Sequence, residues 1–397
     1  MSSSDVEARP RRRPELDAIR TFVVVGLVFF HSALVFDASD DFYVKNPETT
    51  SVTTVLAGFG VLWAMPMLFL IAGLGSWHSL RRRGPGGFAG ERLLRLGVPL
   101  LVATVTIVPV PQWLRLKAAD PAYDESYWQF LGRFFDVHVD LTNFPFVLRG
   151  AYFETGHLWF VVLLIAFSLL LAPAVAVVRA GPARDRVAAW VEARRGASLW
   201  PALLFAAVTA VLGMEESYAG WHRWAYLLFF LSGFLLASDD RFRAAMRRDA
   251  VPAAIAGGVL FLLAGPGLLL AGDDPFTAMT PVALAARALF GAAGWCWVVA
   301  ILGLLDRRRP RSGVRPPAPW YAYLAVAALP LYVLHQPIVV AVAYVVVRWD
   351  APMIVKYLAI VAASLALTLL AYDLLVRRTS ATRALFGMRP QAPRTDP

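Results

Sequence analysis

Residues 15–31 read Glu-Leu-Asp-Ala-Ile-Arg-Thr-Phe-Val-Val-Val-Gly-Leu-Val-Phe-Phe-His, a charged start that runs directly into an apolar segment. Arg20 and His31 are eleven positions apart. Three helical turns take about 10.8 residues, so the two side chains share one helix face, about 16 Å apart along the axis. Asp17 lies one turn before Arg20 on that face. Ionisable groups in an apolar spanning helix are costly and are candidates for function.

The composition is that of a membrane protein. The chain has 397 residues, of which 58% are hydrophobic and 17% charged, and its mean hydropathy is +0.57. A soluble chain carries about 25% charged residues. We therefore predict an all-α polytopic membrane protein with about ten transmembrane helices. The expected spans are 18–36, 54–77, 94–111, 157–178, 199–213, 223–237, 251–271, 281–305, 322–347 and 352–375.

The positive charge follows the predicted topology. Most of the 38 Lys and Arg residues lie in alternate connections: the N-terminal segment, 78–95, 179–198, 238–250, 306–318 and the C-terminal tail. The positive-inside rule makes that side cytoplasmic, including both termini. The net charge of +10 therefore mostly reflects the orientation of the chain in the membrane. It indicates the lipid bilayer as a partner and no nucleic acid, since no compact basic module with interleaved aromatics is present.

The chain divides into a basic cytoplasmic segment 1–17, a membrane domain 18–375 and a basic cytoplasmic tail 376–397. The first apolar run has no clear small-residue cleavage site, so we expect no cleavable signal peptide. The longest connection, 112–156, faces outside and is rich in aromatic residues. It is interpreted either as an interfacial anchor on the bilayer or as a lid or acceptor platform over a cavity mouth.

Two histidines lie inside predicted spans. His31 is either a buried imidazole that bonds to a neighbouring helix or a general base, and its shared face with Asp17 and Arg20 favours the base. His335 follows Tyr332 by one turn. Pro337 cannot donate to the carbonyl of Val333, so the helix is expected to bend here and expose a polar backbone group. The alternatives are a structural kink with a satisfied histidine and a cavity wall.

The remaining candidates lie at the membrane faces. Glu154 and His157 come at the outer edge of the fourth span, where His157 is either an interfacial belt residue or part of a site. Arg92 and Arg95 are one turn apart at the cytoplasmic start of the third span. They are either positive-inside anchors or, with Arg20, a three-guanidinium cluster that would suit phosphate oxygens.

Several common sites are absent from the sequence. We find no Walker loop, no GxGxxG fingerprint and no HExxH zinc helix, so we predict no metal site. The single cysteine, Cys296, excludes an internal disulfide and is interpreted as core packing.

Five segments together resemble the integral-membrane acyltransferase family 3, particularly its glucan succinyltransferase and O-acetyltransferase-like branch. They are Leu16–Arg20 with His31 in R-x10-H spacing, the run 65–73 (Met-Pro-Met-Leu-Phe-Leu-Ile-Ala-Gly), Arg92-Leu-Leu-Arg95, 156–160 (Gly-His-Leu-Trp-Phe) and 332–337 (Tyr-Val-Leu-His-Gln-Pro). One departure is Ala72, where the family often has serine. Each segment alone is weak, but their order and the ten-span topology make the resemblance specific.

The resemblance implies a multi-pass protein of the bacterial inner membrane that takes an acyl group from cytoplasmic acyl-CoA to a carbohydrate hydroxyl on the outer side. Acyl-CoA would be a co-substrate, and no cofactor would be bound permanently. We expect His31 as general base, Arg20 in charge stabilisation or CoA contact, and Asp17 orienting Arg20 or the helix end. We also expect Arg92 and Arg95 to bind the CoA phosphates. The substrate passage would be lined by His335, Tyr332, His157 and Glu154.

Two other functions remain open on the sequence. A transporter or flippase of a glycan or lipid-linked intermediate would also use ten spans and polar lining residues, although no inverted repeat is found. A non-catalytic membrane subunit would leave the Arg20–His31 stripe without a reason. The acyl group, acetyl or succinyl, is not determined, and Arg287 is the one loose candidate for a succinyl carboxylate. The acceptor, a covalent acyl-histidine intermediate and a homo-oligomeric state also stay open.

Overall fold

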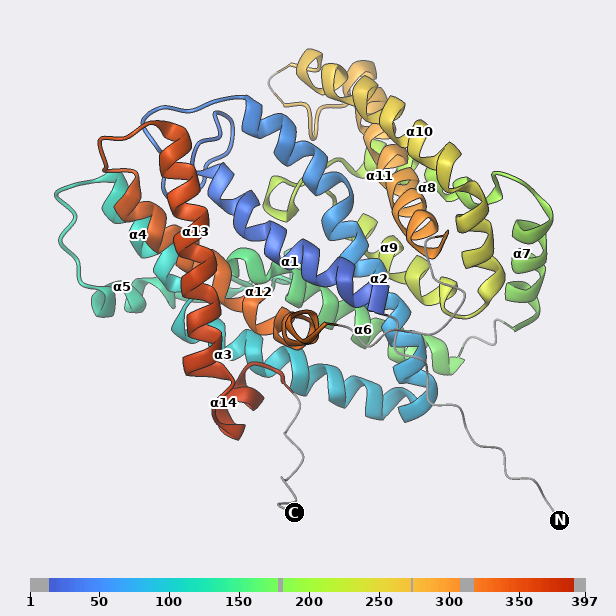
Figure 1. Ribbon diagram of the computed structural model, residues 1–397, viewed down its shortest axis with the longest axis horizontal. Helices are drawn as coiled ribbons and strands as arrows, with labels where there is room; N and C mark the ends of the chain where they lie inside the picture. The colour runs from blue at the N-terminus through green and yellow to red at the C-terminus, as the bar shows by residue number, and fades with distance from the viewer. Residues whose placement is uncertain (1–13, 178–180, 273, 308–317, 389–397) are drawn as a thin grey trace.

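The computed structural model describes residues 14–177, 181–272, 274–307 and 318–388, and within them the predicted all-α fold is confirmed. The long helices run side by side in one layered body (Figure 1). Most of the basic segment 1–17, part of the connection 306–318 and the end of the tail lie outside the described residues.

Fourteen α-helices and two short strands are assigned in the described ranges. The helices are α1 (Pro14–Leu34), α2 (Val52–Arg92), α3 (Val98–Thr106), α4 (Pro109–Ala119), α5 (Tyr127–Phe134), α6 (Trp159–Val177), α7 (Gly181–Ala193), α8 (Pro201–Leu212), α9 (Arg223–Leu236), α10 (Asp240–Leu270), α11 (Pro281–Arg307), α12 (Pro319–Val346), α13 (Met353–Ala371) and α14 (Ser380–Leu385). The strands are β1 (Val137–Val139) and β2 (Leu148–Gly150), which pair antiparallel with His138 opposite Arg149.

Short turns of other helix types connect these elements. Two are π-helical, η1 (Leu93–Gly97) after α2 and η6 (Tyr372–Val376) after α13. The 3-10 turns are η2 (Leu141–Asn143), η3 (Gly156–Leu158), η4 (Ala197–Leu199) and η5 (Glu216–Tyr218).

Seven helical stretches in the described residues have the length and hydropathy to cross a membrane. One of them, Val52–Ala119, contains the second and third predicted spans. The fifth and sixth predicted spans correspond to the shorter helices α8 and α9. The predicted count of ten spans is therefore reached when Val52–Ala119 is counted as two spans and the short helices α8 and α9 are each counted as one.

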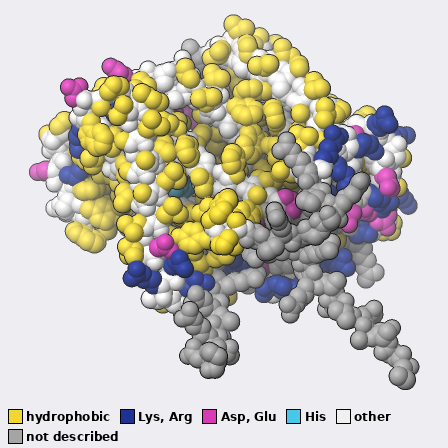
Figure 2. Space-filling model, in the orientation of Figure 1, with side chains coloured by type: hydrophobic (Ala, Val, Ile, Leu, Met, Phe, Trp, Pro, Cys, Tyr) yellow, Lys and Arg dark blue, Asp and Glu magenta, His cyan; other side chains and the backbone are white. Residues whose placement is uncertain are grey.

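The surface separates into apolar and charged regions. Figure 2 shows hydrophobic side chains over the broad face formed by α1, α2, α10 and α13, with Lys and Arg gathered beside α7 and α14. The exposed apolar residues include Phe22, Leu56, Ile255, Leu262 and Leu358, each more than half exposed. Such a continuous apolar surface on a folded chain is expected for contact with lipid.

The composition of the Pro/Gly-rich stretch 84–90 predicts an ordinary cytoplasmic loop, but the structure shows that this prediction is wrong. Gly84 interrupts α2 with φ 71° and ψ 173°, and the helix resumes at Pro85. Proline suits the first turn of a helix because its missing N–H has no partner to lose there. The chain thus stays helical through Arg92 and η1 into α3.

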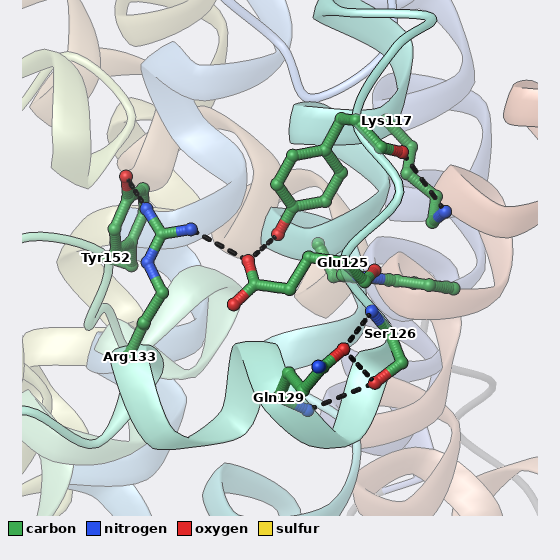
Figure 3. A network of polar contacts seen from close by, with 8 residues as sticks. Lys117, Glu125, Ser126, Gln129, Arg133 and Tyr152 are labelled. Atoms are coloured by element: carbon green, nitrogen blue, oxygen red, sulfur yellow. Dashed lines mark hydrogen bonds and ion pairs between the residues drawn. The ribbon is translucent and has the colours of Figure 1, made fainter.

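The outer connection 112–156 is a folded unit. Helix α5 begins at Ser126, whose side chain accepts a hydrogen bond from the N–H of Gln129 in a capping box. The Glu125 carboxylate accepts hydrogen bonds from Tyr123 and, at 2.7 Å, from Arg133 (Figure 3). These bonds hold the pKa of Glu125 below its ordinary value.

Aromatic packing holds this unit together. Phe130 and Phe134 are fully buried, and their rings contact those of Tyr152 and Phe153. Trp128, by contrast, is 79% exposed. The unit therefore fixes the segment that leads into η3 while presenting an aromatic side chain outward.

Helices α2 and α9 touch through paired glycines. A Cβ built on Gly73 would lie 1.9 Å from the carbonyl oxygen of Phe230, and one on Gly233 would lie 1.9 Å from that of Leu70. Such distances are far below van der Waals contact, so only glycine allows this approach. Small residues at helix crossings are the usual way for membrane helices to pack closely.

We predict that Gly73→Ala disrupts folding, because its methyl group would displace the α9 backbone and overpacking costs about 1–3 kcal/mol or more. Gly75→Ala is the matched control, since a Cβ there meets nothing within 4 Å. The measurement is thermal unfolding and the monodisperse fraction in detergent. Equal stability of the two variants would contradict the close approach of α2 and α9.

Candidate active site

Helix α1 carries both ends of the candidate site. It packs against α2, α12 and α13 (Figure 1). At its beginning, Arg20 Nη1 donates to Asp17 Oδ1 at 3.4 Å, as the one-turn spacing predicts. The Arg20 side chain is 42% exposed although it lies within the helix bundle. The Arg20 side chain is therefore not sealed in the protein core.

The three predicted guanidinium groups do come together. Arg20, Arg92 and Arg95 interact electrostatically with one another at the beginning of α1. Arg92 donates to Ser76 Oγ at 3.1 Å and lies over the Phe88 ring at 5.1 Å, while its Nε has no hydrogen-bond partner among the described residues. An unsatisfied donor inside a cluster of like charges indicates a site for an anion.

One carboxylate balances part of this charge. Glu91 contacts Arg83 at 3.3 Å and Arg95 at 3.5 Å, and it accepts from Ser79 at 3.0 Å. Arg95 also donates to the carbonyl of Gly387, which joins the segment after α14 to this end of the bundle. The π-helical turn η1 begins directly after Arg92, and such turns are frequent at functional sites.

Three histidines from three elements meet near the other end of α1. The ring centroid of His31 lies 5.2 Å from that of His335 on α12, and His335 lies 5.0 Å from His157 in η3. The His31 ring also stacks on Phe42 at 5.8 Å. These residues are far apart in sequence, so the fold alone assembles the cluster.

Proline creates the hydrogen bond that holds His157. Pro337 leaves the Val333 carbonyl without its helical donor, and His157 Nε2 bonds to that oxygen at 3.0 Å. The carbonyl oxygen can only accept, so Nε2 carries the proton. Gln336 adds a second bond by accepting from the N–H of His157 at 3.0 Å, and Tyr332 donates to the His157 carbonyl. His157 is thus 6% exposed and fixed, not an interfacial belt residue.

The same reasoning fixes the tautomer of His335. Its Nδ1 lies 2.6 Å from the Tyr332 carbonyl oxygen and therefore donates. In the neutral ring Nε2 then holds the lone pair, and this buried nitrogen has no partner among the described residues. His31 Nδ1 is also buried without one. Two adjacent imidazoles with unsatisfied buried nitrogens are candidates for proton transfer.

Glu154 lies beyond His157 on the outer side. Its carboxylate accepts a hydrogen bond from the Tyr43 hydroxyl. Burial raises the pKa of Glu154, against the lowering effect of the Tyr43 bond and of Arg115. Burial and the neighbouring Glu154 charge raise the pKa of Tyr43 well above its ordinary value. A carboxyl group with a raised pKa is a functional candidate.

Comparison with known proteins assigns this chain to a family. A family model described as an acyltransferase domain, that of acyltransferase family 3, matches residues 13–373. The chain belongs to this family. No curated protein and no solved structure shows significant similarity to it. The match covers every predicted site residue of this acyltransferase, and it supports membrane acyltransferase activity without defining the donor or the acceptor.

Several contributors to the acyltransferase site could not be found from the sequence. Tyr43 and Phe42 lie in an ordinary-looking loop after α1, and Glu91 was overlooked beside two arginines. The adjacency of Gln336 to Pro337 was a usable signal, because a polar side chain beside a helix break faces freed backbone groups.

Other single residues are structural. Arg287, considered for a succinyl carboxylate, is fully buried and donates to the Ala210 carbonyl at 3.0 and 3.2 Å and to the Pro275 carbonyl at 3.1 Å. Arg287 therefore provides hydrogen-bond donors for a backbone carbonyl in the last turn of α8 and is not available to a substrate carboxylate. Cys296 is 3% exposed in the core, as its interpretation as core packing requires.

We predict that Arg287→Ala lowers the free energy of unfolding by about 2 kcal/mol or more, because unsatisfied buried carbonyls cost about 1–3 kcal/mol each. The preference between acetyl and succinyl donors should not change. Thermal unfolding and donor competition measure these two effects, with the exposed Arg247→Ala as control. A changed donor preference at unchanged stability would return Arg287 to the site.

Proposed function

We propose that this acyltransferase transfers an acyl group, acetyl or succinyl, from cytoplasmic acyl-CoA to a hydroxyl of an envelope or exported carbohydrate in the bacterial inner membrane. The observation that carries the proposal is the pair of polar centres on α1. Arg20 lies, partly exposed, in a guanidinium cluster, and His31 lies about 16 Å further along the helix with an unsatisfied Nδ1.

The guanidinium cluster suits the phosphates of CoA. Arginine stays charged and binds phosphate oxygens in a bidentate manner. Arg92 keeps a free buried Nε, and Arg20 and Arg95 add charge from α1 and η1. The basic surface beside α14 supports a cytoplasmic position for this end under the positive-inside rule. Phosphates held here would leave the acyl thioester directed along α1 toward His31.

The chemistry at His31 needs a base and a donor for the developing oxyanion. In direct transfer the acceptor oxygen bonds to the thioester carbon as its proton passes to the imidazole. The carbon–sulfur bond then breaks, and the proton goes to the departing thiolate. An acyl-imidazole intermediate on His31 would instead divide the transfer into two steps. The alternative of a structural histidine is weakened because Nδ1 has no partner in the described residues.

We predict that acetyl-CoA, succinyl-CoA or free CoA raises the melting temperature of the detergent-purified protein and that Arg92→Ala removes this effect. Loss of a charge-assisted contact should weaken binding about tenfold or more. Arg82→Ala is the control, since Arg82 is an exposed arginine ten residues earlier on α2. No stabilisation by any of the three ligands in folded protein would favour a transporter or flippase.

We also predict that His31→Ala lowers the turnover of acyl-CoA by about 10²–10⁴-fold, the usual contribution of a general base. The stabilisation by CoA should remain, because the phosphates bind at the other end of α1. The exposed His138→Ala on β1 provides the control. Full turnover in His31→Ala would remove His31 from the mechanism while leaving the donor site intact.

A further inference from the structure

Helix α2 folds back on itself at Gly84. Ser79 Oγ donates to Glu91 Oε2 at 3.0 Å, and Arg92 Nη2 donates to Ser76 Oγ at 3.1 Å, although these pairs are 12 and 16 positions apart. In a straight helix, residues with such spacings would lie roughly 18 and 24 Å from each other. Gly84, with φ 71° and ψ 173°, makes the bend that brings them together. The two arms of α2 therefore face each other across Gly84.

The Glu91 carboxylate connects these two arms and η1. Its Oε1 lies 3.3 Å from Arg83 Nη2 and 3.5 Å from Arg95 Nη1, while its Oε2 accepts the bond from Ser79. The Glu91 side chain is 14% exposed, against 35% for Arg83 and 44% for Arg95. The carboxylate is thus more buried than the two guanidinium groups that it contacts.

Positive charge exceeds negative charge around this carboxylate. In the described part of the chain, four guanidinium groups and two carboxylates act on one another here: Arg20, Arg83, Arg92, Arg95, Asp17 and Glu91. The buried Nε of Arg92 also lacks a hydrogen-bond partner among the described residues. A ligand with more than one negative charge would balance this cluster.

The ion pairs of Glu91 are weak. Charge-assisted bonds between nitrogen and oxygen are ordinarily about 2.7–2.9 Å long, whereas Arg83 and Arg95 share one carboxylate oxygen at longer distances. Partly exposed ion pairs of this kind contribute little to stability. A phosphate group can bind a guanidinium group through two parallel bonds. Phosphate oxygens can therefore replace Glu91 at these two arginines.

Ser79 keeps the carboxylate nearby after such a replacement. Its bond to Oε2 is shorter than either ion pair and uses the oxygen that the two arginines do not contact. The negative charge of Glu91 would therefore remain beside a bound phosphate and repel it. The lost ion pairs and this repulsion both lower the apparent affinity for a phosphate ligand.

We propose that Glu91 is a built-in competitor of the ligand's phosphate groups. In the unliganded protein its carboxylate occupies Arg83 and Arg95, and a phosphate group must take these two guanidinium groups from it. Several phosphate groups on one ligand offset the loss, whereas a single phosphate does not. Glu91 thereby makes the cluster selective for ligands with several phosphate groups. The inference rests on the proposed function in one respect, namely that this ligand is CoA.

Calorimetric titration of the detergent-purified full-length protein tests the competition. The probes are CoA, pyrophosphate and 4′-phosphopantetheine, which carries a single phosphate. Glu91→Gln keeps an acceptor for Ser79 and removes the negative charge. We expect this variant to bind CoA and pyrophosphate about tenfold more tightly than wild type at low salt, with a smaller difference at high salt. Binding of 4′-phosphopantetheine should gain at least as much. Glu192→Gln, at an exposed carboxylate of α7, is the matched control and should change none of these affinities.

The sign of the change decides the outcome. A residue that only held Arg83 and Arg95 in position would weaken phosphate binding when lost. Weaker, unchanged or absent binding of both CoA and pyrophosphate in folded Glu91→Gln would therefore overturn the proposal, and Glu91→Ala is a second variant with the same expected direction. Binding of 4′-phosphopantetheine to wild type as tight as that of CoA would also overturn it. Tighter pyrophosphate binding in Glu91→Gln without any binding of CoA would overturn the donor assignment alone.

Discussion

The carbonyl of Val333 organises the part of the protein in which His31, His157 and His335 meet. Pro337 deprives it of a helical donor, and in an apolar interior such a group must find another. It finds His157, which brings η3 and α6 against α12. This single bond fixes which nitrogen of His157 carries the proton and helps to seat it beside His335. A helix-breaking residue thus becomes the means by which two segments about 175 residues apart share one site.

The membrane fold and the Asp17–Arg20 pair at the beginning of α1 could be predicted from the sequence, because both depend on local patterns. Apolar length defines spans, and the spacing of Asp17, Arg20 and His31 on one helix is a matter of helical geometry. The guanidinium cluster also followed, because Arg92 was expected at the same membrane face as Arg20. The sequence did not predict that the chain stays helical on both sides of Gly84. A Gly-Pro pair is typical of a loop, but proline can also occupy the first turn of a new helix.

The contacts of Tyr43 and Glu154 could not be predicted from the sequence, because they join residues that are far apart along the chain. Nothing in the sequence around Tyr43 indicates that it pairs with a carboxylate 111 residues away. Arg287 presents the opposite case. An arginine in a span was a fair candidate for binding substrate, yet its donors satisfy carbonyls at the end of α8 and in the loop before α11. The sequence does not show which carbonyls need a side-chain donor, because that depends on where each helix ends.

Because Arg20 and His31 belong to one continuous helix, their separation is set by the backbone and does not depend on side-chain packing. Helix α1 therefore sets a separation of about 16 Å between the guanidinium cluster and the imidazole. Under the proposed function, a ligand anchored by its phosphates would deliver its far end to His31 only if its connecting arm had the matching length. A shorter or longer arm would bind equally well at the arginines and yet present nothing to the histidine, so chain length itself becomes a criterion of selection.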